Sequence, residues 1–393
     1  MGALLALVGT PALAQTPPAT VAVAFDRTHI RPVLAEGMAD KPAARAVTAD
    51  DPVRIASVSK LVTALGVMRL VDAGKLDLDR DVSDYLGWPL RNPAFPDRPI
   101  TMRLLLSHQS GLVDGGELYL IPLGVTLRER LADPRVWDAR HAPGSGWFHY
   151  TNLNFPVIAS VMERVTGERF DRLMQRLVLK PLRLDACFNW SGCSAGKVAS
   201  AVVLYRASGE VARDDLHGRL PECLVYTEGM APCDLAAYRP GDNGALFSPQ
   251  GGLRISMRDL AKVGRMLANG GKGFLSPVAF AELTRPQWRF DGVNGLGEDG
   301  EASGFFCAYG LAMQTIGTAV TGCRDDLFGD GVRRIGHSGE AYALRSGLWL
   351  DPRTGKGLAF FTTELADDAP KGGSAFTARE EDIVRRAAGT NRR

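Results

Sequence analysis

A serine and a lysine three residues apart, Ser57 and Lys60, are the pair in this chain whose types and spacing could activate a nucleophile. Apolar residues spaced three and four apart over positions 61–71 predict a helix that ends near Gly74. Residues three apart lie on one face of a helix, so the two side chains can touch. A lysine can then take the serine proton. The alternative is a capping serine followed by a lysine in solvent.

Tyr150 and Asn152 form a second candidate cluster within the segment 147–154. A tyrosine beside a lysine ammonium can exchange protons as a general acid or base. An asparagine amide can accept a hydrogen bond from the lysine and donate one to a substrate carbonyl. The alternative is an aromatic loop that packs before a helix.

His337 and Gly339 lie in a third cluster, the segment 336–339, and Glu340 follows it. Small residues in such a segment allow a substrate backbone to approach a strand edge closely. A histidine can donate a hydrogen bond or move a proton near neutral pH. The alternative is a turn that carries a surface histidine.

In this order and spacing, the three clusters resemble the serine β-lactamase and penicillin-binding-protein family. The tyrosine–x–asparagine motif is similar to the branch that includes class C β-lactamases, D-Ala-D-Ala carboxypeptidases, D-aminopeptidases and β-lactamase-like esterases. The resemblance extends over about residues 20–390. The further segments that match are 74–79, 104–112, 248–253 and the helix expected over 256–269.

The resemblance implies a serine hydrolase that works through an acyl-enzyme and needs no metal or organic cofactor. Ser57 would attack a carbonyl, and Lys60 and Tyr150 would share the proton transfers. The family's two oxyanion N–H groups correspond here to those of Ser57 and Glu340, and such donors are worth about 10²–10³ in rate each. The substrate-binding residues implied are Asn152, His337, Gly339 and Glu340.

His337 and Glu340 bear on the choice of substrate. Class C β-lactamases carry a lysine where this chain has His337, which is more similar to the peptidase members. Glu340 should lie where β-lactams and peptides ending in D-alanine present a carboxylate, and it would repel that group unless Arg345 or Arg334 intervenes. We therefore expect weak β-lactamase activity and a better fit for neutral esters, amides or substrates with a free amine. The alternative is a Glu340 side chain that points to solvent.

Two other functions stay open at this point. One is a true class C-like β-lactamase that acts on β-lactam antibiotics. The other is a non-catalytic protein of the same fold that senses cell-wall peptides. The presence of the serine, lysine, tyrosine and asparagine together argues against the sensor.

The composition is that of an ordinary enzyme with a small-molecule or peptide substrate. With 393 residues, the chain can form one large domain or two lobes around a substantial core. Charged residues make up 23% and hydrophobic residues 45%. The net charge of +2 and the scattered basic residues argue against a nucleic-acid surface.

The first 14 residues are apolar and end in Ala12-Leu13-Ala14, a small–x–small signature of signal-peptide cleavage. The basic residues that usually begin a signal peptide are missing, so either translation starts upstream or the stretch is an apolar tail. We expect export, to the periplasm or the medium. No later stretch offers the roughly 20 consecutive apolar residues of a membrane-spanning helix.

Six cysteines fall into three local pairs. An even number in an exported chain favours disulfides, and we expect the sequential connectivity among those possible. A zinc site would need closer spacing such as Cys-x-x-Cys, and buried free thiols are the other alternative. The expected pairs are Cys187 with Cys193, Cys223 with Cys233, and Cys307 with Cys323.

The hydrophobic patterns predict an α/β fold of the α+β type, with an antiparallel sheet flanked by helices and an inserted, mainly helical lobe. A single hydrolase domain would cover residues 15–393. Its sheet lobe would take about 15–90 and 252–393, its helical lobe about 91–251, and the three motifs would meet between them. The clearest expected elements are strands over 21–25, 30–39, 347–350 and 357–363, and helices over 153–165, 170–179 and 378–388.

Overall fold

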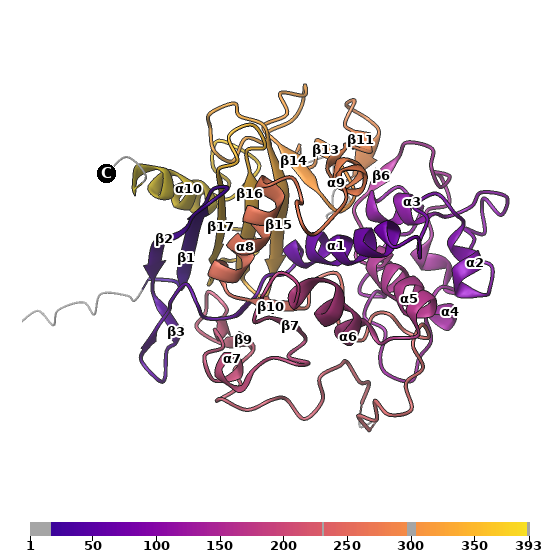
Figure 1. Cartoon of the computed structure of the whole chain (residues 1–393), viewed down its shortest axis with the longest axis horizontal. Helices are drawn as coiled ribbons and strands as arrows, with labels where there is room; N and C mark the ends of the chain where they lie inside the picture. The colour runs from indigo at the N-terminus through magenta and orange to yellow at the C-terminus, as the bar shows by residue number, and fades with distance from the viewer. Residues whose placement is uncertain (1–16, 230–231, 297–303, 391–393) are drawn as a thin grey trace, which may run out of the picture.

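A computed structural model describes residues 17–229, 232–296 and 304–390, so the predicted signal peptide over 1–14 lies outside the described residues. An antiparallel eight-stranded sheet forms one half of the molecule, in the order β11-β13-β14-β15-β16-β17-β1-β2 (Figure 1). Its strands are β1 (Thr20–Phe25), β2 (Ile30–Glu36), β11 (Trp288–Arg289), β13 (Ala308–Tyr309), β14 (Gln314–Ile316), β15 (Arg334–Ala341), β16 (Leu344–Leu350) and β17 (Gly357–Thr362). The predicted fold class is confirmed.

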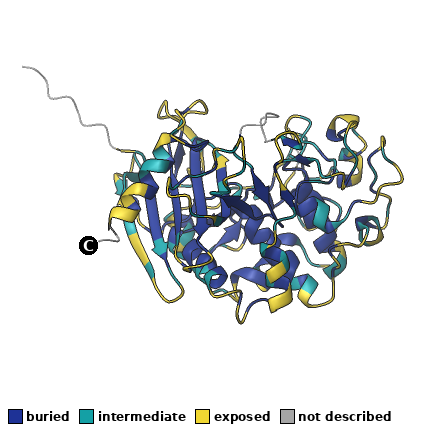
Figure 2. Cartoon of the chain, turned by 90° about the horizontal axis from the view of Figure 1, so that it is seen from above, coloured by how far each residue is buried: buried dark blue, intermediate teal, exposed yellow. Residues whose placement is uncertain are grey.

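Helices pack on both faces of this sheet. Helix α8 (Met257–Ala268) packs against β1, β16 and β17, and α10 (Ala378–Thr390) packs against β1, β2 and β17 on the other side. Side chains along β1 alternate between these two layers, since Val21 belongs to the cluster of α8 and Ala22 to the cluster of α10. Figure 2 shows the central strands buried and the outer side of α10 exposed.

Helix α1 (Val58–Asp72) joins the sheet to the helical half of the molecule. It contacts β15 and β16 on one side and α5 (Asn154–Thr166), α6 (Phe170–Met174) and α9 (Pro277–Thr284) elsewhere. Nearly every residue of α1 is buried, which is typical of a helix surrounded by protein on all sides. The nucleophile candidate therefore lies at the start of a helix that is enclosed by protein.

The helical half contains further short helices. These are α2 (Val82–Leu86), α3 (Met102–Leu106), α4 (Leu127–Arg130), a 3-10 turn (Pro134–Val136), a π turn (Gln175–Leu179) and α7 (Ala195–Ala199). A three-stranded sheet in the order β5-β10-β7 lies under the start of α1. Its strands are β5 (Val53–Arg54), β10 (Leu253–Ile255) and β7 (Cys187–Phe188).

Three two-stranded ribbons complete the described secondary structure. They pair β3 (Met38–Asp40) with β4 (Arg45–Ala46), β6 (Phe148–His149) with β12 (Gly295–Leu296), and β8 (Leu204–Tyr205) with β9 (Val211–Arg213).

Two predicted elements differ in detail from the structure. The strand predicted over 30–39 is divided at Gly37, which adopts φ +84° and turns the chain between β2 and β3. The helix predicted over 170–179 is α-helical only to Met174 and continues as the π turn. The strands of the large sheet come from residues 20–36 and 288–362. The predicted division of the chain into a sheet lobe and a helical lobe stays a prediction.

The three cysteine pairs predicted from the sequence form disulfides, with Cα–Cα distances of 5.1, 5.6 and 6.1 Å in chain order. Each disulfide closes a short loop outside the longer helices. Among the described helices, none is long and apolar enough to cross a membrane.

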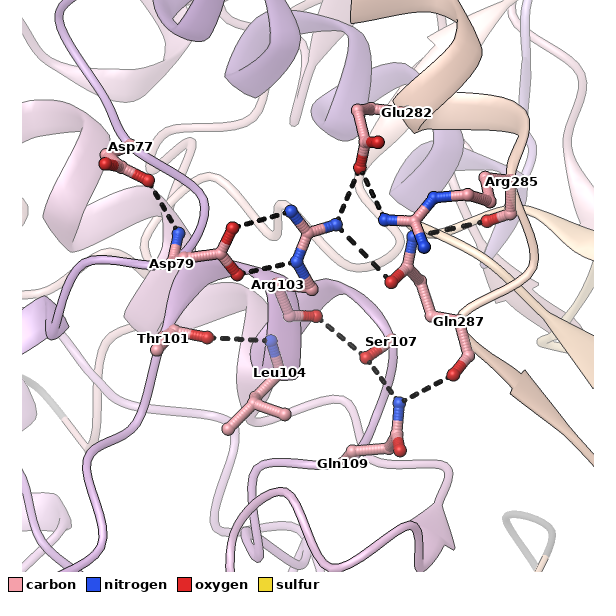
Figure 3. A network of polar contacts seen from close by, with 10 residues as sticks. All are labelled: Asp77, Asp79, Thr101, Arg103, Leu104, Ser107, Gln109, Glu282, Arg285 and Gln287. Carbon is pink, nitrogen blue, oxygen red and sulfur yellow. Dashed lines mark hydrogen bonds and ion pairs between the residues drawn. The ribbon is translucent and has the colours of Figure 1, made fainter.

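Arg103 on α3 joins segments that are distant in sequence (Figure 3). Its guanidinium forms ion pairs with Asp79 at 2.7 Å and with Glu282 of α9 at 2.8 Å. Its carbonyl accepts from the Ser107 hydroxyl, and the Gln109 amide donates to that hydroxyl in turn. The network therefore fixes the loop after α3, which passes beside the candidate site.

Candidate active site

Ser57 occupies the N-cap position of α1, yet its side chain makes no capping hydrogen bond. Its hydroxyl instead accepts a hydrogen bond from the Lys60 ammonium at 2.9 Å. The preceding residue, Ala56, adopts φ +46°, a conformation that is uncommon for a residue with a side chain and is found at functional turns. These contacts favour the nucleophile over the capping interpretation.

Lys60 is fully buried, with 0% of its surface exposed. Besides Ser57, its ammonium donates to the Asn152 side-chain oxygen at 2.7 Å and to the Gln250 carbonyl at 3.3 Å. The ammonium also lies 4.8 Å from the centre of the Tyr150 ring. The structure therefore brings together the first two motifs, which are about ninety residues apart in the chain.

The Tyr150 ring is held between two other rings. His108 stacks on one side at 4.4 Å between ring centres, and Phe306 stacks at 4.6 Å. His108 also accepts the Thr151 backbone N–H at Nδ1, so its proton is on Nε2. Burial, together with the Lys60 charge, lowers the pKa of His108 well below its ordinary value, and the ring is neutral. The sequence pointed to the loop 104–112 but not to this role.

Asp114 determines which way the Asn152 amide faces. Its carboxylate accepts from the Asn152 side-chain NH₂ at 2.9 Å, from the Leu153 backbone N–H at 2.9 Å and from the Thr151 hydroxyl. Because a carboxylate only accepts, it holds the NH₂ of Asn152 and leaves the amide oxygen to face Lys60. No sequence pattern identified Asp114, since an acidic residue in a glycine-rich loop has no distinctive spacing.

Strand β15 lies directly against the turn that carries Ser57. A Cβ atom on Gly339 would lie 2.4 Å from the Ile55 carbonyl oxygen and 3.1 Å from the Ser57 backbone nitrogen. The Ser346 hydroxyl on β16 donates to the same Ile55 carbonyl at 2.8 Å. Glycine at 339 is therefore required for this approach, and the third motif joins the other two.

His337 does not project a free nitrogen from β15. The residue is fully buried, and its Nδ1 bonds the Ser338 carbonyl, which can only accept. Its Nε2 therefore accepts from the Tyr309 hydroxyl at 2.7 Å. Burial, with the Lys60 charge as a second cause, lowers the pKa of His337 to about 3. These contacts favour a role in positioning β15 over the predicted role in binding substrate.

Glu340 and Arg345 are cross-strand neighbours on β15 and β16 and form an ion pair at 2.6 Å. The Arg345 side chain is 6% exposed and that of Glu340 56% exposed, so the carboxylate faces solvent with its counter-ion behind it. Of the two arginines considered from the sequence, Arg345 pairs with Glu340, whereas Arg334 pairs with Asp330 at 2.7 Å.

The comparisons with known proteins agree with this geometry. A model of the Beta-lactamase family matches residues 13–379. The chain belongs to the Beta-lactamase family. The resemblance found in its three motifs is thereby confirmed.

Several proteins of this family are similar to the chain. Esterase EstB from Burkholderia gladioli is 31% identical over 69% of this chain and 73% of its own length. Penicillin-binding protein 4 from Amycolatopsis lactamdurans is 27% identical over 75% of this chain and 80% of its own length. The fold is similar to that of the D-amino acid amidase from Ochrobactrum anthropi SV3, with a TM-score of 0.65, 18% identity and coverage of 96% of this chain and 94% of that one.

We predict that replacing Asp114 by alanine lowers kcat/KM for 4-nitrophenyl butyrate by about 10- to 100-fold, mainly through kcat. The Asn152 amide loses the acceptor that holds its NH₂ and can turn its oxygen away from Lys60. Glu117→Ala, which removes an exposed carboxylate from the same loop, is the matched control and should keep wild-type kinetics. A folded Asp114→Ala enzyme with unchanged kcat would contradict the assignment.

The buried His337 predicts a particular pH dependence of stability. Because its pKa is about 3 in the folded protein, against an ordinary value of 6.5 for the imidazole, the unfolded chain binds a proton that the folded chain does not. The free energy of unfolding should therefore fall as the pH drops from 6.5 towards 3, by on the order of 1 kcal/mol per pH unit from this group.

Urea unfolding of the wild type and of His337→Gln over this pH range measures that contribution. In His337→Gln, the free energy of unfolding should fall less steeply with decreasing pH, by the amount expected for one bound proton. His29→Gln, which removes an exposed histidine, should keep the wild-type dependence on pH. Equal slopes for the wild type and His337→Gln would show that the ring is not held neutral.

Proposed function

We propose that this chain is a serine hydrolase that cleaves an ester or amide bond through an acyl-Ser57 intermediate. The observation that carries the proposal is the hydrogen bond of 2.9 Å between the buried Lys60 ammonium and a Ser57 hydroxyl that makes no capping bond. The esterase among the similar proteins, 31% identical, supports the same class of reaction.

In the proposed reaction, Ser57 Oγ forms a bond to the substrate carbonyl carbon as its proton passes to the Tyr150 phenolate oxygen. The Lys60 ammonium, which donates to Ser57 and has no lone pair, stabilises that phenolate. Tyr150 then returns the proton to the leaving alkoxide or amine, and the acyl-serine ester remains. Water then attacks this ester and regenerates Ser57. The backbone N–H groups of Ser57 and Glu340 would hold the oxyanion, in agreement with the close approach of β15 at Gly339.

Two observations favour an esterase or amidase over a class C-like β-lactamase. The residue at the position of the family's lysine, His337, is buried and neutral, so it supplies no cation for a β-lactam carboxylate. The exposed carboxylate of Glu340 lies one residue after the strand segment that contacts the nucleophile turn. Arg345 neutralises much of its charge but adds no free cation. A substrate carboxylate is therefore repelled beside Glu340.

The class C-like β-lactamase and the peptide sensor are the competing proposals. A sensor of cell-wall peptides would need the fold but not the Lys60–Ser57 contact or the orientation of Asn152 by Asp114. Burial of a lysine is unfavourable for stability, so its presence argues for a role in chemistry.

We also propose that the protein is exported and that residues 1–14 act as its signal peptide. The three disulfides support an oxidising compartment such as the periplasm or the medium.

The proposal predicts hydrolysis of short-chain 4-nitrophenyl esters and its loss on replacement of the nucleophile. Ser57→Ala should lower kcat by about 10³-fold or more, because the acyl-enzyme cannot form. Ser59→Ala, a change of a buried serine two residues away on the same helix, is the control and should keep most of the activity. Equal ester hydrolysis by Ser57→Ala and the wild type would exclude this serine as the nucleophile.

The contacts of His337 and Glu340 predict slow turnover of nitrocefin compared with esters and D-amino-acid amides. Parallel kinetics on nitrocefin, 4-nitrophenyl butyrate, D-phenylalanine amide and a D-Ala-D-Ala peptide would rank the substrate classes. We expect kcat/KM for nitrocefin to be about 100-fold or more below that for the best ester. Nitrocefin as the best substrate of the panel would instead support the class C-like β-lactamase.

A further inference from the structure

Arg54, three residues before Ser57, is a buried cation that forms no ion pair with a carboxylate among the described residues. It lies on β5 with 8% of its surface exposed, and its buried Nε has no hydrogen-bond partner in the described part of the chain. The nearby carboxylate of Asp214 attracts the Arg54 charge but forms its ion pair with Arg254, at 2.9 Å. A buried charge that must share its counter-ion in this way is stabilised by any further anion that reaches it.

The surroundings of Arg54 carry an excess of positive charge. Arg254 is its cross-strand partner, and Arg213 also lies close to the Tyr342 ring. The Tyr342 ring centre is 5.0 Å from the Arg54 guanidinium and 5.5 Å from that of Arg213. Arg54 and Arg254 thus share the Asp214 carboxylate, and Arg213 adds a third positive charge nearby. Burial, with the Arg254 charge as a second cause, lowers the pKa of Arg54 to about 10, which still leaves it charged at neutral pH.

This cationic cluster adjoins the catalytic residues. The Arg54 Nη2 and the Ala56 carbonyl carbon lie 3.7 and 3.8 Å from the point where a Cβ on Gly251 would project. Gly251 follows Gln250, whose carbonyl accepts from Lys60. On the other side, Tyr342 lies in the turn after β15, two residues beyond Glu340. The cluster is therefore enclosed by the segments that also form the Ser57 site.

We propose that Arg54, with Arg213 and Tyr342, forms an anion subsite that binds a carboxylate at the far end of the substrate chain. A guanidinium suits this ligand because its planar N–H groups match both oxygens of a carboxylate. The inference rests on the proposed function and adds a substrate class to it, namely esters or amides whose chain ends in a carboxylate. A carboxylate beside Glu340 is disfavoured, whereas one that reaches Arg54 gains a counter-ion.

Matched pairs of substrates that differ only in the terminal charge test this subsite. The half-esters 4-nitrophenyl hydrogen adipate and 4-nitrophenyl hydrogen suberate are each compared with their methyl-capped diesters. With the better chain length, the wild type should prefer the charged ester in kcat/KM by about tenfold or more, the effect of one charge-assisted hydrogen bond. A preference for the capped diester at both chain lengths would overturn the proposal.

Two variants test whether Arg54 and Arg213 cause the preference for the charged ester. Arg54→Gln should abolish it and leave kcat/KM for the capped diester within a few-fold. Arg213→Gln, at an exposed position where folding is not at risk, should reduce it. Arg353→Gln removes another exposed charge, far from this cluster, and should keep the full preference. If Arg54→Gln loses activity on both members of a pair while Arg213→Gln keeps the preference, the arginine only holds the Tyr342 turn, and the proposal fails.

Binding of adipate alone separates the subsite from the proposed chemistry. In a Ser57→Ala background, adipate should raise Tm in a concentration-dependent manner, and Arg54→Gln should remove this shift. This readout does not need hydrolysis, so a shift without ester turnover would refute the proposed function but keep the subsite. Turnover of neutral esters without any adipate shift or charge preference would refute the subsite alone.

Discussion

The burial of the Lys60 ammonium is the constraint on which the rest of the site depends. A lysine without exposed surface must find hydrogen-bond acceptors inside the protein, because an unpaired buried charge is strongly unfavourable. Here a hydroxyl, a side-chain amide and a backbone carbonyl accept from it. These oxygens come from α1, from the loop before α5 and from the loop before β10, so satisfying one cation fixes three segments of the chain relative to each other.

Each of these segments is held in turn by a further contact. Asp114 sets the orientation of the Asn152 amide, His108 and Phe306 enclose the Tyr150 ring, and the Arg103 network holds the loop that bears His108. On the sheet side, Ser346 and Gly339 bring β15 and β16 against the turn before Ser57. These contacts hold the side chains that would touch a substrate, so the arrangement of the site is fixed before the substrate binds.

Local patterns in the sequence were sufficient for the two longest predicted helices of the motifs and for the contact between Ser57 and Lys60. The periodic helices α1 and α5 begin and end close to the predicted residues, because apolar spacing and glycine ends are local signals. The limits of α8 were expected from the family resemblance and are also close. The roles of Asp114 and His337 could not be predicted in this way. Asp114 acts on residues 37 to 39 positions away, and the burial of His337 depends on pairing with β14 and on Tyr309, properties that no local pattern encodes.

The central claim is that Lys60 makes Ser57 an acylating nucleophile. Labelling with a fluorophosphonate, followed by peptide mass spectrometry, tests it most directly. We expect a single covalent adduct on Ser57, no adduct in Ser57→Ala, and labelling slowed by about 100-fold or more in Lys60→Met. Labelling of Lys60→Met at the wild-type rate, or an adduct on another serine, would contradict it.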